Sequence, residues 1–332
     1  GGYHLACDAR DAAAVAALRS RKYRKEKPFA LMVRDVATAR ELVVLDEAGA
    51  ALLASTARPI VLAPARVTLP GVAPDNYELG VMLPYTPLHH LLFDAGAPAA
   101  LVMTSANRSN EPLAYQDEAA RRELDGIADA FLVGQRPIAR RVDDSVARFG
   151  PGGPLLLRRA RGYAPGAVAE LPTRRPLLAL GPDLKNTLTL VVDGQAFVSQ
   201  HLGDLDYAEV QTAFRETIDD LLRMYDVAPT NLLIAHDAHP AYVSTRHAAT
   251  LPGPRVAVQH HRAHVAAVLA EHGRWDEPVV GVALDGTGWG DDGTIWGGEI
   301  FAGSLRDGLV RVAHQRPARL PGGDAAARFP AQ

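Results

Sequence analysis

The stretch Ala99-Ala100-Leu101-Val102-Met103-Thr104-Ser105-Ala106-Asn107 runs from an apolar segment directly into polar residues. Five small or apolar residues in a row, followed by a turn signal, are typical of a buried β-strand. When such a strand ends in hydroxyl and amide groups, those groups lie at the edge of a sheet, where ligand sites are often found. The segment therefore predicts a strand over 99–103 and a polar turn over 104–107.

Around this strand the first half of the chain has the pattern of an α/β domain, because short apolar runs alternate with Ala-rich amphipathic stretches up to about Arg161. Strands are predicted over 29–33 and 59–62, and Asp8 is predicted to cap a helix through Val15 and Leu18. Arg, Pro and Gly then accumulate between Arg158 and Arg175 and interrupt regular structure. We place a domain boundary there.

The second half opens with apolar runs over 177–180, 187–192 and 196–199, which predict a strand meander with Asp193-Gly194 as its hairpin turn. Helical spacing of apolar residues from Tyr207 to Tyr225 predicts an amphipathic helix on that sheet. Further strands are expected over 231–235, 256–259 and 279–284. The predicted fold class is α/β, with domains over 1–165 and 166–332.

Composition excludes several classes of protein. The formal net charge of -3 over 332 residues gives no overall positive field for a nucleic-acid backbone. The single cysteine, Cys7, excludes an internal disulfide framework and a multi-cysteine zinc site in this stretch, and it suits the cytoplasm. The apolar runs are too short to cross a bilayer. The chain opens on Gly1 rather than methionine, so we expect a fragment boundary there.

A dense basic segment lies between the first predicted helix and the strand over 29–33. It contains six cations in nine residues, namely Arg19, Arg21, Lys22, Arg24, Lys25 and Lys27. Such density is costly without an anion, but a solvated helix end opposing the helix dipole is an equally good interpretation from composition alone. The polar turn, extended by Arg108-Ser109-Asn110-Glu111-Pro112, could hold phosphate oxygens and the water shell of a metal ion, or be only a polar loop.

Taken together, the basic segment and the Ser-x-Asn turn resemble the YrdC family, in which they face each other across a cleft that binds ATP and forms an acyl-adenylate. The resemblance is closer still to the YrdC-like domain of the HypF family of hydrogenase maturation proteins. It is carried by five motifs: GGYHLACDA at 1–9, KPFALM at 27–32, LPYTPLHHLL at 83–92, DDSV at 143–146 and RRARGYAP at 158–165.

The resemblance implies a nucleotide site, with ATP and Mg²⁺ as its ligands. Lys22, Arg24 and Lys27 would contact phosphates, Ser105 and Asn107 the nucleotide, and Arg141, Ser145 and Arg158 the far wall of the cleft. Adenylation brings an anionic carbamoyl group to a highly charged nucleotide, so the enzyme has to gather cations and hydrogen-bond donors.

A second candidate site follows the strand over 256–259. His260 and His264 are four residues apart, which on a helix places both imidazoles on one face, within reach of one metal ion. Two surface histidines on a turn are the alternative. Asp285 follows the strand over 279–284 in Asp285-Gly286-Thr287-Gly288, where it could be a third ligand, a catalytic carboxylate or only a turn cap.

These motifs, with His236-Asp237-Ala238-His239-Pro240, resemble the actin-like metal-binding domain shared by the HypF family, antibiotic O-carbamoyltransferases and tRNA threonylcarbamoyl-transferring enzymes. The resemblance implies that His260, His264 and Asp285 hold iron or zinc, with a fourth ligand later in the family protein. Asp285 and Lys185 are the implied catalytic residues, Lys185 either near a nucleotide phosphate or in a tight turn. The family motif Pro321-Gly322-Gly323-Asp324-Ala325-Ala326 lies near the end.

The function implied by the HypF resemblance is carbamoyl transfer. Carbamoyl phosphate and ATP would give carbamoyl-adenylate, and the carbamoyl group would pass to the carboxyl-terminal cysteine of HypE during nickel-iron hydrogenase maturation. One alternative is an O-carbamoyltransferase of small-molecule biosynthesis, a family that has the two modules in the opposite order. The other is a YrdC-type RNA-binding or threonylcarbamoyl-adenylate module, which the acidic net charge disfavours.

The resemblance covers nearly the whole chain but only part of the family protein. It implies that the acylphosphatase domain, the zinc fingers, the first YrdC-like strand and the later half of the actin-like domain lie outside this stretch. Activity of this part alone is therefore not implied.

Overall fold

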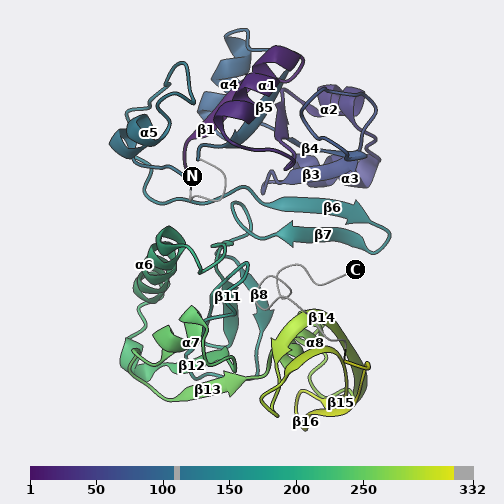
Figure 1. The fold of residues 1–332 in the computed structure, drawn as a ribbon, viewed down its shortest axis with the longest axis vertical. Helices are drawn as coiled ribbons and strands as arrows, with labels where there is room; N and C mark the ends of the chain where they lie inside the picture. The colour runs from purple at the N-terminus through teal and green to yellow at the C-terminus, as the bar shows by residue number, and fades with distance from the viewer. Residues whose placement is uncertain (108–112, 318–332) are drawn as a thin grey trace. The chain divides into compact units, whose positions relative to one another are not determined.

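The computed structural model describes residues 1–107 and 113–317 (Figure 1). The motif segments at 108–112 and 321–326 lie outside the described residues. The chain divides into two compact units, Gly1–Ala164 and Pro165–Gln332, one residue from the boundary expected at 165/166. Each unit is an α/β structure with its own hydrophobic core, as the sequence predicts.

The described part of the first unit contains a mixed seven-stranded sheet in the order β1-β5-β2-β4-β3-β6-β7. Its strands are β1 (His4–Asp8), β2 (Ala30–Val33), β3 (Ile60–Pro64), β4 (Glu78–Met82), β5 (Ala100–Ser105), β6 (Val146–Gly150) and β7 (Gly153–Arg158). The strands predicted over 29–33, 59–62 and 99–103 correspond to β2, β3 and β5. Strand β5 runs antiparallel to β1, and this register pairs His4 with Ser105.

Helices cover both faces of this sheet. They are α1 (Ala12–Arg21), α2 (Val36–Leu42), α3 (Glu47–Ala54), α4 (Pro87–Asp94) and α5 (Asp117–Glu123). Residues of α1, α2, α3 and α5 share the larger core with β2 and β5, whereas Phe93 of α4 packs with Met32 and Met103 on the opposite face.

The N-cap of α1 is Asp11 rather than Asp8, so the cap predicted from the sequence is wrong. Oδ1 of Asp11 accepts hydrogen bonds from the N–H groups of Ala13 and Ala14, whereas Asp8 ends β1 and accepts one from Arg10. Because β1 extends to Asp8, the helix begins one turn later than expected.

The second unit opens with a six-stranded sheet, counted over its described residues, in the order β13-β12-β9-β10-β11-β8. Its strands are β8 (Ala167–Glu170), β9 (Leu177–Ala179), β10 (Thr189–Val192), β11 (Gln195–Val198), β12 (Leu233–Asp237) and β13 (Arg255–Val258). The predicted hairpin joins β10 and β11, and both Asp193 (φ 50°) and Gly194 (φ 83°) have the left-handed conformation of a type I′ turn.

Helix α6 (Ala208–Met224) confirms the amphipathic helix predicted over 207–225. Its buried face packs with β9, β10 and β12, and Phe214 is 1% exposed. The short 3-10 helix η1 (Pro229–Asn231) leads into β12, and α7 (Val243–Ala248) lies between β12 and β13. Strands β9, β12 and β13 are parallel, so their carboxyl ends meet at one edge of the sheet.

Helix α8 (His260–Glu271) follows β13 and packs on a three-stranded antiparallel sheet within the described residues (Figure 1). The strands are β14 (Val279–Trp289), β15 (Ile295–Ser304) and β16 (Gly308–His314). The strand predicted over 279–284 is longer than expected, because pairing with β15 resumes at Gly288 after a register irregularity. Asp285 therefore lies inside β14 and not in a turn after it. Among the described residues, no helix is long and apolar enough to cross a bilayer.

The core of the second unit depends on Phe214. We expect Phe214→Ala to lower the free energy of unfolding by about 3–5 kcal/mol, because the substitution leaves a cavity that α6 and the sheet cannot close. Met224→Ala on the same helix, at a side chain 46% exposed, should change it by less than about 1 kcal/mol. Chemical denaturation measures both, and equal effects would contradict the packing described here.

Candidate functional site

Lys22 lies directly after α1 and is fully buried. Its ammonium group donates hydrogen bonds to Ser105 O (2.6 Å), Asn107 O (2.5 Å) and Asn107 Oδ1 (2.6 Å). Ser105 Oγ in turn donates to Asn107 Oδ1 at 2.7 Å. A buried ammonium group needs such acceptors to offset its lost hydration. The basic segment and the polar turn, predicted to face each other, are therefore joined through Lys22.

Arg19 shapes the rest of the basic segment, a role that the sequence did not predict. Its guanidinium group donates to a set of main-chain oxygens, those of Gly71, Val72, Arg24, Lys25 and Lys27. Arg24 donates to the main-chain oxygens of Lys27 and Pro28. Both guanidinium groups lie over the ring of Phe29, at 4.5 and 5.3 Å from its centroid. These cations therefore fix the loop before β2.

The same loop gathers positive charge. Burial, and then the neighbouring guanidinium groups of Arg19 and Arg158, lowers the pKa of Arg24 to about 10. Arg158, at the end of β7, was predicted to line the same cleft as Arg24, and its positive charge is one of the causes that lower the pKa of Arg24. An anion between them would relieve this repulsion, since opposite charge favours the ionised form.

The remaining residues predicted for the nucleotide site have other contacts. Ser145 is fully buried, and its hydroxyl donates to Arg161 O at 2.9 Å and accepts from Ala160 N–H at 2.8 Å. The guanidinium of Arg141 lies 5.9 Å from the Tyr115 ring centroid, and Lys27 is exposed. Their roles toward a nucleotide stay predictions.

A polar network around Asp144 was not predicted from the sequence. Asp144 Oδ2 lies 3.1 Å from His4 Nε2, and Arg161 Nε donates to Asp144 Oδ1 at 2.8 Å. The Arg161 guanidinium stacks 3.4 Å from the Tyr85 ring centroid. Despite burial, His4 and Arg161 hold the pKa of Asp144 well below its usual range. The four residues of this network each belong to a different family motif, and that membership was the sequence signal for the network.

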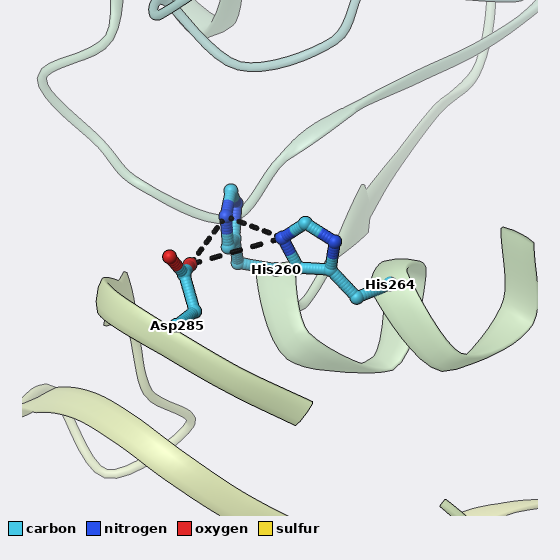
Figure 2. A group of neighbouring side chains, drawn as sticks. All are labelled: His260, His264 and Asp285. Carbon is cyan, nitrogen blue, oxygen red and sulfur yellow. Dashed lines mark hydrogen bonds and ion pairs between the residues drawn. The ribbon is translucent and has the colours of Figure 1, made fainter. Parts of the chain in front are cut away.

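The predicted metal ligands converge in the second unit (Figure 2). His260 and His264 lie one turn apart on α8, and Asp285 reaches them from β14. His260 Nε2 is 3.2 Å from His264 Nε2 and 3.0 Å from Asp285 Oδ2. His264 Nε2 is 3.7 Å from Asp285 Oδ2. Metal–ligand distances of about 2.0–2.2 Å place tetrahedral ligands about 3.4 Å apart. The three atoms therefore have the spacing of one metal ion's ligands.

The electrostatics of this cluster also fit a cation. Among the described residues, Asp285 Oδ2 is buried and has no hydrogen bond of regular geometry. Burial opposes the ionisation of Asp285, yet His260, His264 and the Gly286 N–H hold its pKa well below its usual range. Asp237 and then Asp285 raise the pKa of His260 to about 9. The His264 side chain is 57% exposed, which leaves one side of the cluster accessible.

Local packing explains why α8 and β14 approach so closely. An added Cβ at Gly288 would lie 2.5 Å from His261 Cε1 and 3.1 Å from His260 Cβ. Gln259, the N-cap of α8, accepts from Arg262 N–H and donates through Nε2 to Trp289 O at 3.1 Å. The glycine and the buried amide thus hold the first turn of α8 against β14.

Two further residues lie beside the metal cluster, and the sequence predicted no role for either. Asp237 is at the end of β12, and its Oδ2 lies 2.8 Å from His260 Nδ1. Tyr242 stacks on His239 with 4.1 Å between the ring centroids. Burial, then the carboxylates of Asp237, Asp183 and Asp285, raises the pKa of Tyr242 to about 12. The aspartate after a buried parallel strand was the signal for Asp237.

Lys185 has the geometry of a tight turn. Its φ of 49° is left-handed, its side chain is exposed, and its N–H donates to Asp204 Oδ1 at 2.8 Å. Asp183, two residues earlier, accepts from the N–H groups of Val243 and Ser244 and so caps α7. The catalytic role of Lys185 stays a prediction.

Comparisons with known proteins agree with this division. A Sua5/YciO/YrdC family model, described as telomere recombination, matches residues 1–160. Two further models follow, "HypF Kae1-like domain" at 172–271 and "Carbamoyltransferase, Kae1-like Domain, second subdomain" at 281–332. The chain thus combines a YrdC-like domain with Kae1-like carbamoyltransferase domains.

Relatives that match nearly the whole chain are named carbamoyltransferases of the HypF type. The chain is 51% identical to carbamoyltransferase HypF2 of Cupriavidus necator over 99% of its length, and 48% identical to carbamoyltransferase HypF of Rhodobacter capsulatus over 98%. It spans 43% and 44% of these relatives. A crystal structure of full-length HypF matches 98% of the chain and 43% of its own, with a TM-score of 0.91 and 43% identity. The chain belongs to the HypF carbamoyltransferase family.

The close contact at Gly288 gives a test of the metal cluster. We expect Gly288→Ala to weaken Zn(II) binding by about tenfold or more, because the added methyl group pushes His260 and His261 away from Asp285. Isothermal titration calorimetry measures the affinity. Gly152→Ala is the control, since a Cβ there meets no atom within 4 Å. Unchanged affinity in Gly288→Ala would show that this contact does not position the ligands.

Proposed function

We propose that this chain contributes both chemical steps of a HypF-type carbamoyltransferase, carbamoyl activation in the first unit and carbamoyl transfer in the second. The convergence of His260, His264 and Asp285 carries the proposal, because it gives a metal-ligand geometry in a chain whose relatives are named carbamoyltransferases. The chain spans less than half of those relatives, so the full reaction is a property of the longer protein.

In the first unit we place the activation of the carbamoyl group. We assign the hydrolysis of carbamoyl phosphate to carbamate and phosphate to the acylphosphatase domain that the family resemblance implies outside this stretch. In the first unit an oxygen of the carbamate then attacks the α-phosphorus of ATP, and pyrophosphate leaves. Arg24 and Arg158 offset the repulsion between the two anions, which is the main obstacle to this step. Lys22 holds the Ser105–Asn107 turn in place for the nucleotide and Mg²⁺. A crystal structure of full-length HypF is described as phosphate- and nucleotide-bound, which supports this assignment.

In the second unit we place the transfer to a thiol. A bound iron or zinc ion would polarise the carbamoyl carbonyl as a Lewis acid. His260, His264 and Asp285 would hold it, and the exposed side at His264 admits the acceptor. We propose HypE as the acceptor in the maturation of nickel-iron hydrogenase. The sulfur of its carboxyl-terminal cysteine would bond to the carbamoyl carbon as AMP leaves and the thiol proton passes to solvent. The match of this unit to Kae1-like carbamoyltransferase domains supports the assignment.

Nucleotide binding tests the first site. We expect Arg24→Met to weaken binding of Mg·ATP by about tenfold or more, since a charge-assisted hydrogen bond contributes about 1.5–3 kcal/mol. Arg10→Met, which removes an exposed cation from the loop after β1, should leave the affinity unchanged. Equilibrium dialysis with labelled ATP measures both. Equal affinities in the two variants would place the nucleotide elsewhere.

Carbamoyl transfer tests the second site. The longer protein carrying this chain should add one carbamoyl group to purified HypE in the presence of carbamoyl phosphate and ATP, as read from the mass of HypE. His264→Ala and prior chelation should each abolish the mass increase, because each removes part of the metal site. His272→Ala, an exposed histidine after the same helix, is the control. Full transfer by His264→Ala would contradict the proposed metal site.

A further inference from the structure

The two oxygens of the Asp237 carboxylate have different partners. Oδ1 accepts a hydrogen bond from the His239 N–H at 2.8 Å, and Oδ2 lies 2.8 Å from Nδ1 of His260. The Asp237 side chain is 6% exposed. Both oxygens of a buried carboxylate are therefore directed at fixed donors, which holds the side chain in one orientation.

This arrangement has a consequence for His260. Its Nδ1 faces Asp237. Its Nε2 lies 3.0 Å from Asp285 Oδ2 and 3.2 Å from His264 Nε2. A neutral imidazole carries one hydrogen, and a carboxylate oxygen can only accept. With the hydrogen on Nδ1, the lone pair of Nε2 points into the cluster, as coordination requires.

We infer that Asp237 is a positioning residue, which fixes the Nδ1–H tautomer and the ring orientation of His260 so that Nε2 is presented to a metal ion. This inference rests on the metal site in the proposed function. Asp237 contacts Nδ1, whereas the other two atoms of the metal cluster lie at Nε2, so Asp237 acts through His260.

The fold builds this pair from two parallel strands. Asp237 ends β12, and its register partner in β13 is Val258, two residues before His260. The main-chain oxygen of Asp237 also accepts from Thr245 Oγ1 at 3.0 Å, which ties the end of β12 to α7. Asp237 and the first residue of α8 therefore emerge side by side from the same edge of the sheet.

The Asp237→Asn substitution distinguishes a role in positioning His260 from the simple loss of the Asp237–His260 contact. In Asp237→Asn the side chain would have one oxygen for two donors. If that oxygen stays on the His239 N–H, the amide NH₂ faces His260 Nδ1 and drives the hydrogen to Nε2, where it blocks coordination. In Asp237→Ala the tautomer is free. The isosteric variant is therefore expected to bind metal more weakly than the truncated one.

The experiment measures Zn(II) affinity by calorimetry on the full chain and its Asp237→Asn and Asp237→Ala variants. We expect at least a tenfold loss in Asp237→Asn and a smaller loss in Asp237→Ala. Asp291→Asn is the matched control, because it also removes one carboxylate near α8, where Asp291 pairs with Arg262 at 2.7 Å. It should leave the affinity unchanged. An Asp237→Asn chain that binds zinc like the parent, or better than Asp237→Ala, overturns the inference.

The tautomer of His260 is a second readout, independent of metal. Long-range ¹H–¹⁵N correlation spectra of the metal-free chain, recorded at a pH at which the spectra show a neutral His260 ring, should show Nδ1–H in the parent and Nε2–H in Asp237→Asn. The same tautomer in both overturns the inference. If the parent does not bind zinc but the tautomer changes as expected, the proposed metal site fails while the positioning role of Asp237 holds.

Discussion

A buried charge has to be met by hydrogen-bonding or oppositely charged groups, and in each unit this constraint joins segments that are distant in the sequence. In the first unit the ammonium of Lys22 lies on the main chain of Ser105 and Asn107. In the second, His260 lies between carboxylates that come from β12 and β14. The constraint is satisfied at both candidate sites, so contacts that hold the fold together also build these sites.

The network around Asp144 shows the same principle on a larger scale. His4, Tyr85, Asp144 and Arg161 come from four separate motifs of the family, and they meet in a single set of contacts. The β1–β5 register places His4 opposite Ser105, so this network adjoins the turn that Lys22 holds. One residue from each of these four motifs therefore belongs to a single polar cluster beside this turn.

Local sequence patterns predicted much of the fold and the two histidines of the metal cluster. The type I′ turn at Asp193-Gly194, the periodicity of α6 and the spacing of His260 and His264 all depend on neighbouring residues, and the structure has them. An aspartate at the end of a buried strand is a local signal, but the contact of Asp237 with His260 depends on the pairing of β12 with β13, which no local pattern encodes. A turn cap was one alternative for Asp285, but pairing with β15 resumes at Gly288, so Asp285 lies inside β14.

The metal cluster is asymmetric, and the asymmetry follows from where each imidazole sits. His260 is mostly buried and held by carboxylates on both ring nitrogens, whereas His264 is one turn further along α8 and mostly exposed. A metal-ligating side chain that is held on both sides loses little conformational freedom when an ion binds. An exposed side chain keeps the freedom to adjust its position. The buried half of the cluster is therefore preorganised, and the exposed half at His264 is the side open to solvent.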